Sequence, residues 1–212
     1  PLGRVDYDSL QVSVNRRFSE GLAFTASYAL AKGTDAWATG ILIPEYRYLN
    51  EGPSSHVSPN KLDLSASYEL PFGAGKRYLN DGVAGAVLGG WQVNAYFTAF
   101  SGSTMTMTAS GASLNAPGSA QRADEVAPFK VLGGVGPNSP WFDTASFAAV
   151  TQPRFGTSKA NGYRGPGYAN LDASLFRTFR FSQSVSAQFR IEALNLTNTP
   201  HFANPGTNVN AI

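Results

Sequence analysis

The chain has 212 residues, of which 42% are hydrophobic, 12% aromatic and only 14% charged. It contains no cysteine, which excludes a disulfide framework and a thiolate metal site. The net charge of +2 is too small to indicate a nucleic-acid partner. No run approaches the roughly 18 apolar residues of a membrane helix, and the 22 glycines and 13 prolines favour many strands joined by turns.

The chain begins with two alternating segments joined by a tight turn. Apolar and polar residues alternate over residues 5–18 and again over residues 22–31. The intervening Ser19-Glu20-Gly21 is typical of a hairpin turn. Side chains of a strand point to opposite faces with a period of two, so each segment predicts one apolar and one polar face. A long loop is expected over about residues 32–59, where Gly and Pro interrupt the pattern.

Two cleaner strands follow, over residues 60–70 and 91–100, separated by a Gly-rich connector over residues 71–90. Thr and Met alternate after the second of these strands, which indicates that it continues to residue 108. A second long and irregular loop, rich in Gly, Pro, Asn and Ser, is expected over about residues 109–167.

The clearest pattern is the hairpin over residues 168–196, in which the polar turn Ser182-Gln183-Ser184 joins two alternating arms. Each arm has about 10 residues, the length that a tilted strand needs to cross a bilayer. The five connectors are, in order, short, long, medium, very long and short. Bacterial barrels keep periplasmic turns short and outer loops long, on alternate sides of the membrane. The sequence therefore predicts an all-β fold, an antiparallel up-and-down transmembrane β-barrel segment of about six strands, with long outer loops over 32–59 and 109–167.

The alternation assigns individual side chains to the two sides of the barrel wall. The lipid-facing or girdle residues are Tyr28, Leu64, Tyr68, Trp91, Val93, Phe97, Phe189 and Ile191. The lumen-facing polar residues are Asp63, Ser65, Glu69, Gln92, Asn94, Asp172, Arg190 and Glu192. Loops on a rigid scaffold often bind ligands, and exposed aromatic rings suit sugars or peptides. The candidate ligand contacts in the outer loops are therefore Trp37, Tyr46, Tyr48, Trp141 and Phe142.

Basic residues also gather near the expected periplasmic side. They are Arg16, Arg17, Lys76, Arg77, Arg177 and Arg180. Two interpretations stay open: these side chains meet anionic lipid head groups, or they are solvated turn ends.

Several phrases resemble the barrel of TonB-dependent receptors, and more narrowly the Oar-like group that carries an N-terminal carboxypeptidase-regulatory-like domain. They are YELPFGAGKR (68–77), GGWQVNAYFTAFSG (89–102), RGPGYANLDASLFRTFRF (164–181) and FRIEALNLTNTPHFANP (189–205). The resemblance implies a bacterial outer-membrane barrel of roughly 22 strands, filled by a plug and coupled to the inner-membrane TonB energy complex. Substrate would be bound or taken up without chemistry, cofactor or metal.

Residues 1–212 are expected to be a partial C-terminal barrel domain of that family. The sequence opens on Pro1-Leu2-Gly3-Arg4 without an initiator Met, and contains no plug. It ends on Val209-Asn210-Ala211-Ile212 rather than on a final strand with a terminal aromatic residue. The expected partners are outer-membrane lipid, the rest of the same barrel and its plug, and, through the plug, the TonB complex.

Two other classes of function could use parts of the same pattern. A soluble secreted all-β module that binds carbohydrate or protein would use the same alternation to build a core. A hydrolase would need a positioned nucleophile and base, but His56 lies in a Pro-flanked loop and no G-x-S-x-G elbow is present. Neither His56 with Glu51 nor Asp6 with Asp8 has a recognised metal-ligand spacing. The prediction is that the protein is not an enzyme.

Overall fold

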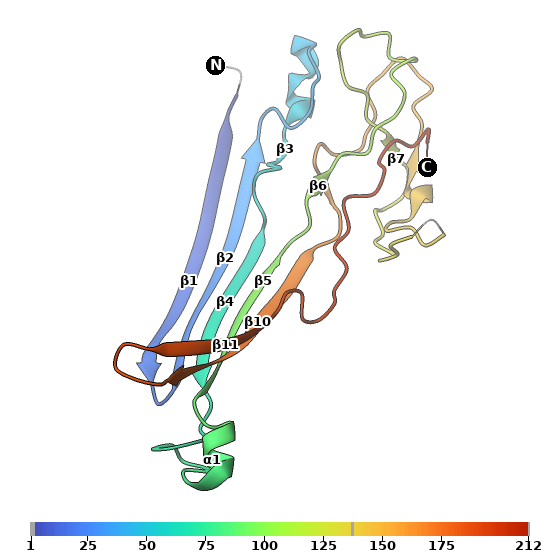
Figure 1. Ribbon diagram of the computed structural model, residues 1–212. Helices are drawn as coiled ribbons and strands as arrows, with labels where there is room; N and C mark the ends of the chain where they lie inside the picture. The colour runs from blue at the N-terminus through green and yellow to red at the C-terminus, as the bar shows by residue number, and fades with distance from the viewer. Residues whose placement is uncertain (1–2, 137, 212) are drawn as a thin grey trace.

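The computed structural model describes residues 3–136 and 138–211. Six long strands form one antiparallel sheet in the order β1-β2-β4-β5-β10-β11, an up-and-down arrangement that follows the chain (Figure 1). Their bounds are β1 (Val5–Ser19), β2 (Leu22–Asp35), β4 (Asn60–Glu69), β5 (Trp91–Phe100), β10 (Tyr168–Arg180) and β11 (Ser186–Ala193). The all-β, antiparallel prediction is confirmed, and the sheet is open at β1 and β11. Pro1, Leu2 and Ile212, on which expectations about the chain ends partly depend, lie outside the described residues.

The register of the strands joins their apolar positions into one continuous face. One row across the sheet runs through Val14, Ala26, Leu64, Phe97 and Leu171. The neighbouring row, on the opposite face, runs through Ser13, Ser27, Asp63, Thr98 and Asn170. A shift of one residue between any two strands would move a whole set of apolar side chains to the polar face.

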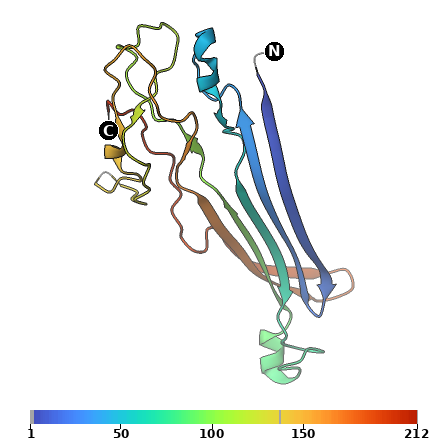
Figure 2. The same ribbon diagram turned by 180° about the vertical axis from the view of Figure 1, so that it is seen from behind.

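The two ends of the sheet differ, as the connector lengths predict. The short turns between β1 and β2 and between β10 and β11 lie at one end, with the 70–90 connector, and we name this the turn end (Figures 1 and 2). The long loops gather at the other end, named the loop end. In the first turn Glu20 and Gly21 have φ of 52° and 84°. Two successive positive φ values twist a hairpin turn in the same sense as its strands, and glycine adopts them at little cost.

The loop-end boundaries of β2 and β5 differ from the prediction. β2 continues to Asp35, because Asp35 pairs with Val5 and also with Gly52 of the two-residue strand β3 (Gly52–Pro53). The first long loop therefore starts at residue 36 rather than 32. The continuation of β5 to residue 108 is wrong: β6 (Thr104–Met105) leaves the large sheet and pairs with β9 (Tyr163–Arg164).

The Gly-rich connector contains a helix that the sequence pattern did not indicate, α1 (Gly82–Leu88). It lies below the sheet at the turn end (Figure 1). Within the described residues, no helix is both long enough and apolar enough to span a membrane.

The irregular loop expected over 109–167 is instead a folded unit with its own core. We name the loop module residues 36–59, 101–167 and the tail 199–210. Its short elements are η1 (Pro44–Asn50), β7 (Asp124–Glu125), η2 (Thr144–Ser146) and β8 (Phe147–Ala148), and β7 pairs with β8. Its central cluster of buried residues is Met105, Met107, Ala123, Phe142, Phe147 and Tyr163. The tail joins this unit, since Val209 packs on the cluster and the Thr108 and Val209 amides donate to the Thr207 and Thr108 carbonyls.

Candidate functional site

The apolar face of the large sheet is uncovered. Leu64, Phe189 and Ile191 are 37%, 50% and 53% exposed. Within the described residues, the long strands pack edge to edge on their sheet neighbours and form no second layer on this face. A soluble monomer rarely exposes a contiguous apolar patch of this size. The face is therefore built to meet an apolar surrounding.

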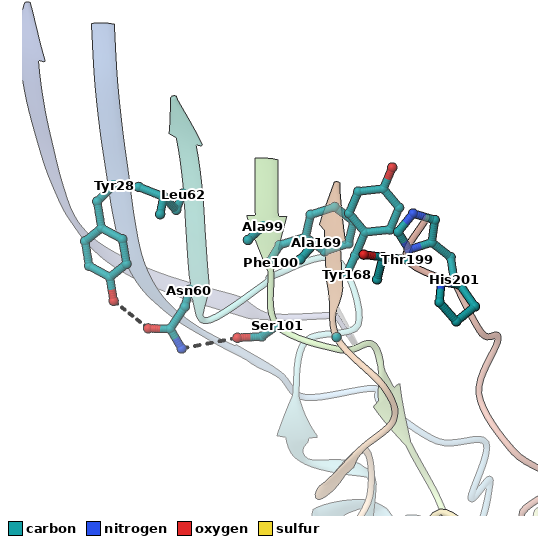
Figure 3. A pocket seen from close by; sticks show the side chains of 12 residues that line it. Tyr28, Asn60, Leu62, Ala99, Phe100, Ser101, Tyr168, Ala169, Thr199 and His201 are labelled. Atoms are coloured by element: carbon teal, nitrogen blue, oxygen red, sulfur yellow. Dashed lines mark hydrogen bonds between the residues drawn. The ribbon is translucent and has the colours of Figure 1, made fainter. Parts of the chain in front are cut away.

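Toward the loop end this face carries a hydrogen-bonded tyrosine, Tyr28. The Tyr28 hydroxyl donates to Asn60 Oδ1 at 2.6 Å, and Asn60 Nδ2 donates to Ser101 Oγ at 3.2 Å (Figure 3). A pocket of about 480 Å³ lies beside this chain of bonds, and Tyr168 and His201 line it. The two rings stack with centroids 4.1 Å apart. An apolar ring with a wet tip is the side chain typical of a membrane boundary.

Aromatic rings mark the turn end of the same face. Trp91 and Phe189 meet edge to face, with centroids 6.0 Å apart, and Tyr68 is one residue from the end of β4. The Trp91 indole N–H donates to the Val87 carbonyl at 3.1 Å. The residues assigned to lipid or girdle thus share one face, with rings at both of its ends.

The opposite face carries linked polar and charged groups. Asp63 accepts hydrogen bonds from Thr98 Oγ1 at 2.8 Å and from the Tyr96 hydroxyl at 3.1 Å. Lys61 Nζ lies 3.3 Å from its second oxygen. Each Asp63 oxygen therefore has a donor, which stabilises the charged carboxylate in the middle of the large sheet.

Further along this face lies a shallow groove of about 410 Å³. Asp172 lines it and accepts from Asn170 Nδ2 at 2.8 Å and from the Asn195 amide at 2.7 Å. Glu192 lines the groove too and pairs with Arg190 at 3.2 Å. The residues assigned to the lumen all lie on this face, by register, and the face has the polarity of a surface in contact with water.

The five loop aromatics do not form one cluster. Trp37, Tyr46 and Tyr48 belong to the first long loop, where Tyr46 and Tyr48 are 44% and 69% exposed. Phe142, only 2% exposed, packs inside the loop module. Trp141 packs against the same cluster and its indole N–H donates to the Arg164 carbonyl at 3.0 Å.

Sequence reasoning missed the centre of the loop module. Tyr163 packs against Phe129 and Phe147, with centroids 4.9 and 5.1 Å apart. Its hydroxyl donates to Glu125 Oε2 at 2.7 Å, and burial together with this carboxylate raises the pKa of Tyr163. No periodic signal marks these residues, because they come from short elements far apart in the chain.

A charged pair and a buried guanidinium connect the parts of the loop module. Both Arg154 terminal nitrogens donate to Asp124, each at 2.7 Å, and this pairing lowers the pKa of the Asp124 carboxyl. Arg122, 5% exposed, donates to the Leu49 carbonyl at 3.2 Å and to the Gly156 carbonyl at 3.3 Å. Arg122 thereby attaches the first long loop to the second.

The first long loop is organised around a buried amide. Asn50 is fully buried, and its Oδ1 accepts from the Ile41 amide and from Thr39 Oγ1, both at 2.8 Å. Its Nδ2 donates to the Ile41 carbonyl at 2.8 Å. The Asn50 side chain, at the end of η1, thus holds residues 39–41 in place.

The two histidines lie apart from any such cluster. Ser54 is buried and its hydroxyl accepts from the His56 backbone amide at 3.4 Å, while His201 stacks on Tyr168. Among residues 3–136 and 138–211 no group of three or more His, Asp or Glu is placed to hold a metal ion.

The comparisons with known proteins agree with this geometry. A family model described as an outer membrane beta barrel domain matches residues 1–212. No curated protein and no solved structure matches the chain. The expected location in the bacterial outer membrane is confirmed, and a soluble secreted module is set aside. Since the match spans the whole chain, the protein belongs to the outer membrane beta barrel domain family.

Proposed function

We propose that the protein is the barrel of an Oar-like, TonB-dependent receptor that binds or takes up a substrate at the cell surface and performs no chemistry. One observation carries this proposal: a single-layer sheet with a bare apolar face and a hydrogen-bonded polar face. Lipid on one side and a wet lumen on the other satisfy both faces at once. The loop module, attached at one end of the sheet, would then lie outside the cell.

The open edges support a larger barrel. In hydrocarbon each unpaired backbone N–H or C=O group costs about 3 kcal/mol. The edge strands β1 and β11 therefore need further strands beside them. Six strands at about 4.8 Å spacing form only an arc of wall, too narrow to enclose a plug. A barrel of roughly 22 strands has room for one, as the resemblance to TonB-dependent receptors implies. The plug and the TonB complex are the partners that follow from this proposal.

The exposed aromatics of the loop module are the proposed ligand contacts. Tyr46 and Tyr48 project from η1, which Asn50 and Arg122 hold in place. A rigid base with exposed rings suits sugars or peptides, because stacking on a fixed ring costs little conformational entropy.

Transport can be tested with the full-length protein in its own host. Cells with and without the gene are grown in a medium of peptides and oligosaccharides, and compound loss from the medium is measured by mass spectrometry. We expect a subset of compounds to disappear only when the gene is present. Collapse of the inner-membrane proton gradient should stop this loss while leaving surface binding intact. Loss that is independent of the gene, or of the gradient, would refute the receptor proposal.

The role of the loop aromatics needs a matched pair of variants. The triple variant Trp37→Ala, Tyr46→Ala, Tyr48→Ala should weaken binding of the same compounds by about 10-fold or more. Leu42→Ala, at a 52% exposed residue of the same loop, is the control and should leave binding unchanged. Equal binding by both variants would assign recognition to other residues.

A further inference from the structure

α1 lies below the sheet at the turn end (Figure 1), and side chains of the apolar face donate hydrogen bonds to it. The Arg177 guanidinium donates to the Ala86 carbonyl at 2.6 Å and to the Val87 carbonyl at 2.8 Å. Trp91 donates to the same Val87 carbonyl. Arg177 and Trp91 are register partners, in the strand positions that belong to the apolar face. The last carbonyls of α1 are thus held by side chains from the proposed lipid side, not from the lumen side.

One side of α1 packs closely and the other does not. A Cβ on Gly85 or Gly89 would collide with the Leu79 carbonyl or with the Gly73 backbone, so these glycines press the helix against its own connector. At 100° per residue, Val83 and Val87 project from the opposite side. They are 81% and 58% exposed, and Leu88 is 48% exposed.

The sequence of α1, GVAGAVL, has no polar side chain and a poor helix propensity. Its N-cap residue Asp81 makes no side-chain capping bond. Water would favour polar residues in so exposed a turn. An apolar surface that continues an apolar sheet face is instead typical of a segment at the edge of the bilayer.

The connector that carries α1 also carries an unpaired cation. Among the described residues, Arg77, exposed in the connector of α1, has no acidic partner within 4.0 Å, whereas Lys76 pairs with Glu69 at 2.6 Å and Arg16 with Glu20 at 3.6 Å. In the described part of the chain Arg17 and Arg180 have no such partner either, but the strand period puts Arg180 on the polar face with Asp172. Head groups of an anionic leaflet attract basic residues at this depth. The cation and the apolar surface of α1 therefore both indicate contact with an anionic lipid leaflet.

We infer that α1 is an interfacial anchor that inserts Val83 and Val87 into the periplasmic leaflet, while Arg77 of the same connector contacts anionic phospholipid head groups. This inference rests on the proposed assignment of the apolar face to lipid. It adds a contact outside the barrel wall, which would fix the depth of the turn end in the membrane.

Single-cysteine labelling tests this inference, because residues 1–212 contain no cysteine. The full-length protein, with any cysteine elsewhere replaced, is labelled with an environment-sensitive fluorophore at Val83→Cys, Leu64→Cys or Ser65→Cys. Each variant is reconstituted into vesicles of phosphatidylethanolamine and phosphatidylglycerol, with or without spin-labelled lipids as quenchers. Val83 is almost fully exposed, so its substitution should not disturb folding.

We expect spin-labelled lipid to quench the label at Leu64 and at Val83 about two-fold or more, with the Val83 label nearer the head groups, and to leave the label at Ser65 unchanged. Quenching at Leu64 without quenching at Val83 would overturn the anchor but not the barrel orientation. No quenching at Leu64 would overturn the orientation itself. Replacing phosphatidylglycerol by phosphatidylcholine should reduce the quenching at Val83, and an unchanged signal would refute the role of Arg77.

Discussion

The large sheet and the loop module bury their hydrophobic residues in opposite ways. Every buried hydrophobic side chain among the described residues, from Ile41 to Tyr163, lies in the loop module. The sheet has none, and Leu10, Val12 and Ile191 on its apolar face are more than half exposed. One chain thus contains a unit that is stable through its own packing and a unit that needs an apolar solvent.

This difference shows that hydrophobic content alone does not locate a core. Both regions have aromatic and aliphatic residues, but the sheet orders them by strand period and the module gathers them from short, distant segments. The period-two pattern sends apolar groups outward to lipid, whereas the aperiodic one lets them meet each other. Substitutions that act on one region only can separate the two kinds of stability.

The largest effect is expected at the centre of the loop module. Phe142→Ala should cost the module about 3–5 kcal/mol, because it removes a ring in contact with Phe129 and Phe147 and leaves a cavity. The measurement is protease sensitivity of the loops on intact cells. Val126→Ala, at a 61% exposed site, is the control. Membrane insertion should be unaffected, and a barrel that fails to insert would show that the two regions are not independent.

A charge on the apolar face should act on the sheet instead. Leu64→Arg is expected to destabilise the inserted barrel by about 2–4 kcal/mol, the cost of an arginine facing the bilayer midplane. The neighbouring Ser65→Arg faces the polar side and should cost far less. Urea unfolding of the full-length protein in vesicles measures both. If Ser65→Arg were the more harmful variant, the two faces would have to be exchanged.

A smaller loss is expected in the first long loop. Asn50→Ala leaves the Ile41 amide, the Ile41 carbonyl and the Thr39 hydroxyl without their partner, at a cost of about 1–3 kcal/mol. Hydrogen exchange at the Ile41 amide should speed up accordingly. Asn50→Asp keeps one acceptor oxygen but loses the donor to the Ile41 carbonyl and buries a charge, so it should be at least as harmful as the alanine variant. Unchanged exchange in the alanine variant would mean that contacts other than those of the Asn50 side chain hold the loop.

The smallest effect concerns acid. The pKa of Asp124 is lowered in the folded module, mainly by the hydrogen bond from Arg154. The stabilisation is therefore present above the unfolded pKa of about 3.9 and is lost as the pH falls through the folded value. For so exposed an arginine the loss should stay below about 1 kcal/mol. Protease resistance of the loops from pH 7 to pH 3 should show it, and Asp124→Asn should remove the Asp124 part of the pH dependence.

The strands were predictable from sequence and the module was not. β4 and β5 match their predicted segments within one residue, because alternation and turn residues act locally. Nothing local marks Met107, Phe147 and Tyr163 as neighbours, since packing among short segments leaves no period. α1 was hidden by its glycines, which lower helix propensity but allow the close contact with Gly73. The two faces of the sheet were predictable because the side chains of a strand alternate between its faces. Which loop aromatics are exposed and which are buried depends on tertiary packing, which the sequence pattern does not show.

The tail has a consequence for the order of assembly. The Ser110 amide donates to Asn210 Oδ1, a residue 100 positions later, and Val209 completes the packing around Met107. Between these two points the chain makes the β10–β11 hairpin. The module therefore reaches its final form only after that hairpin has been synthesised, so in the proposed orientation its maturation would report that the hairpin has been inserted.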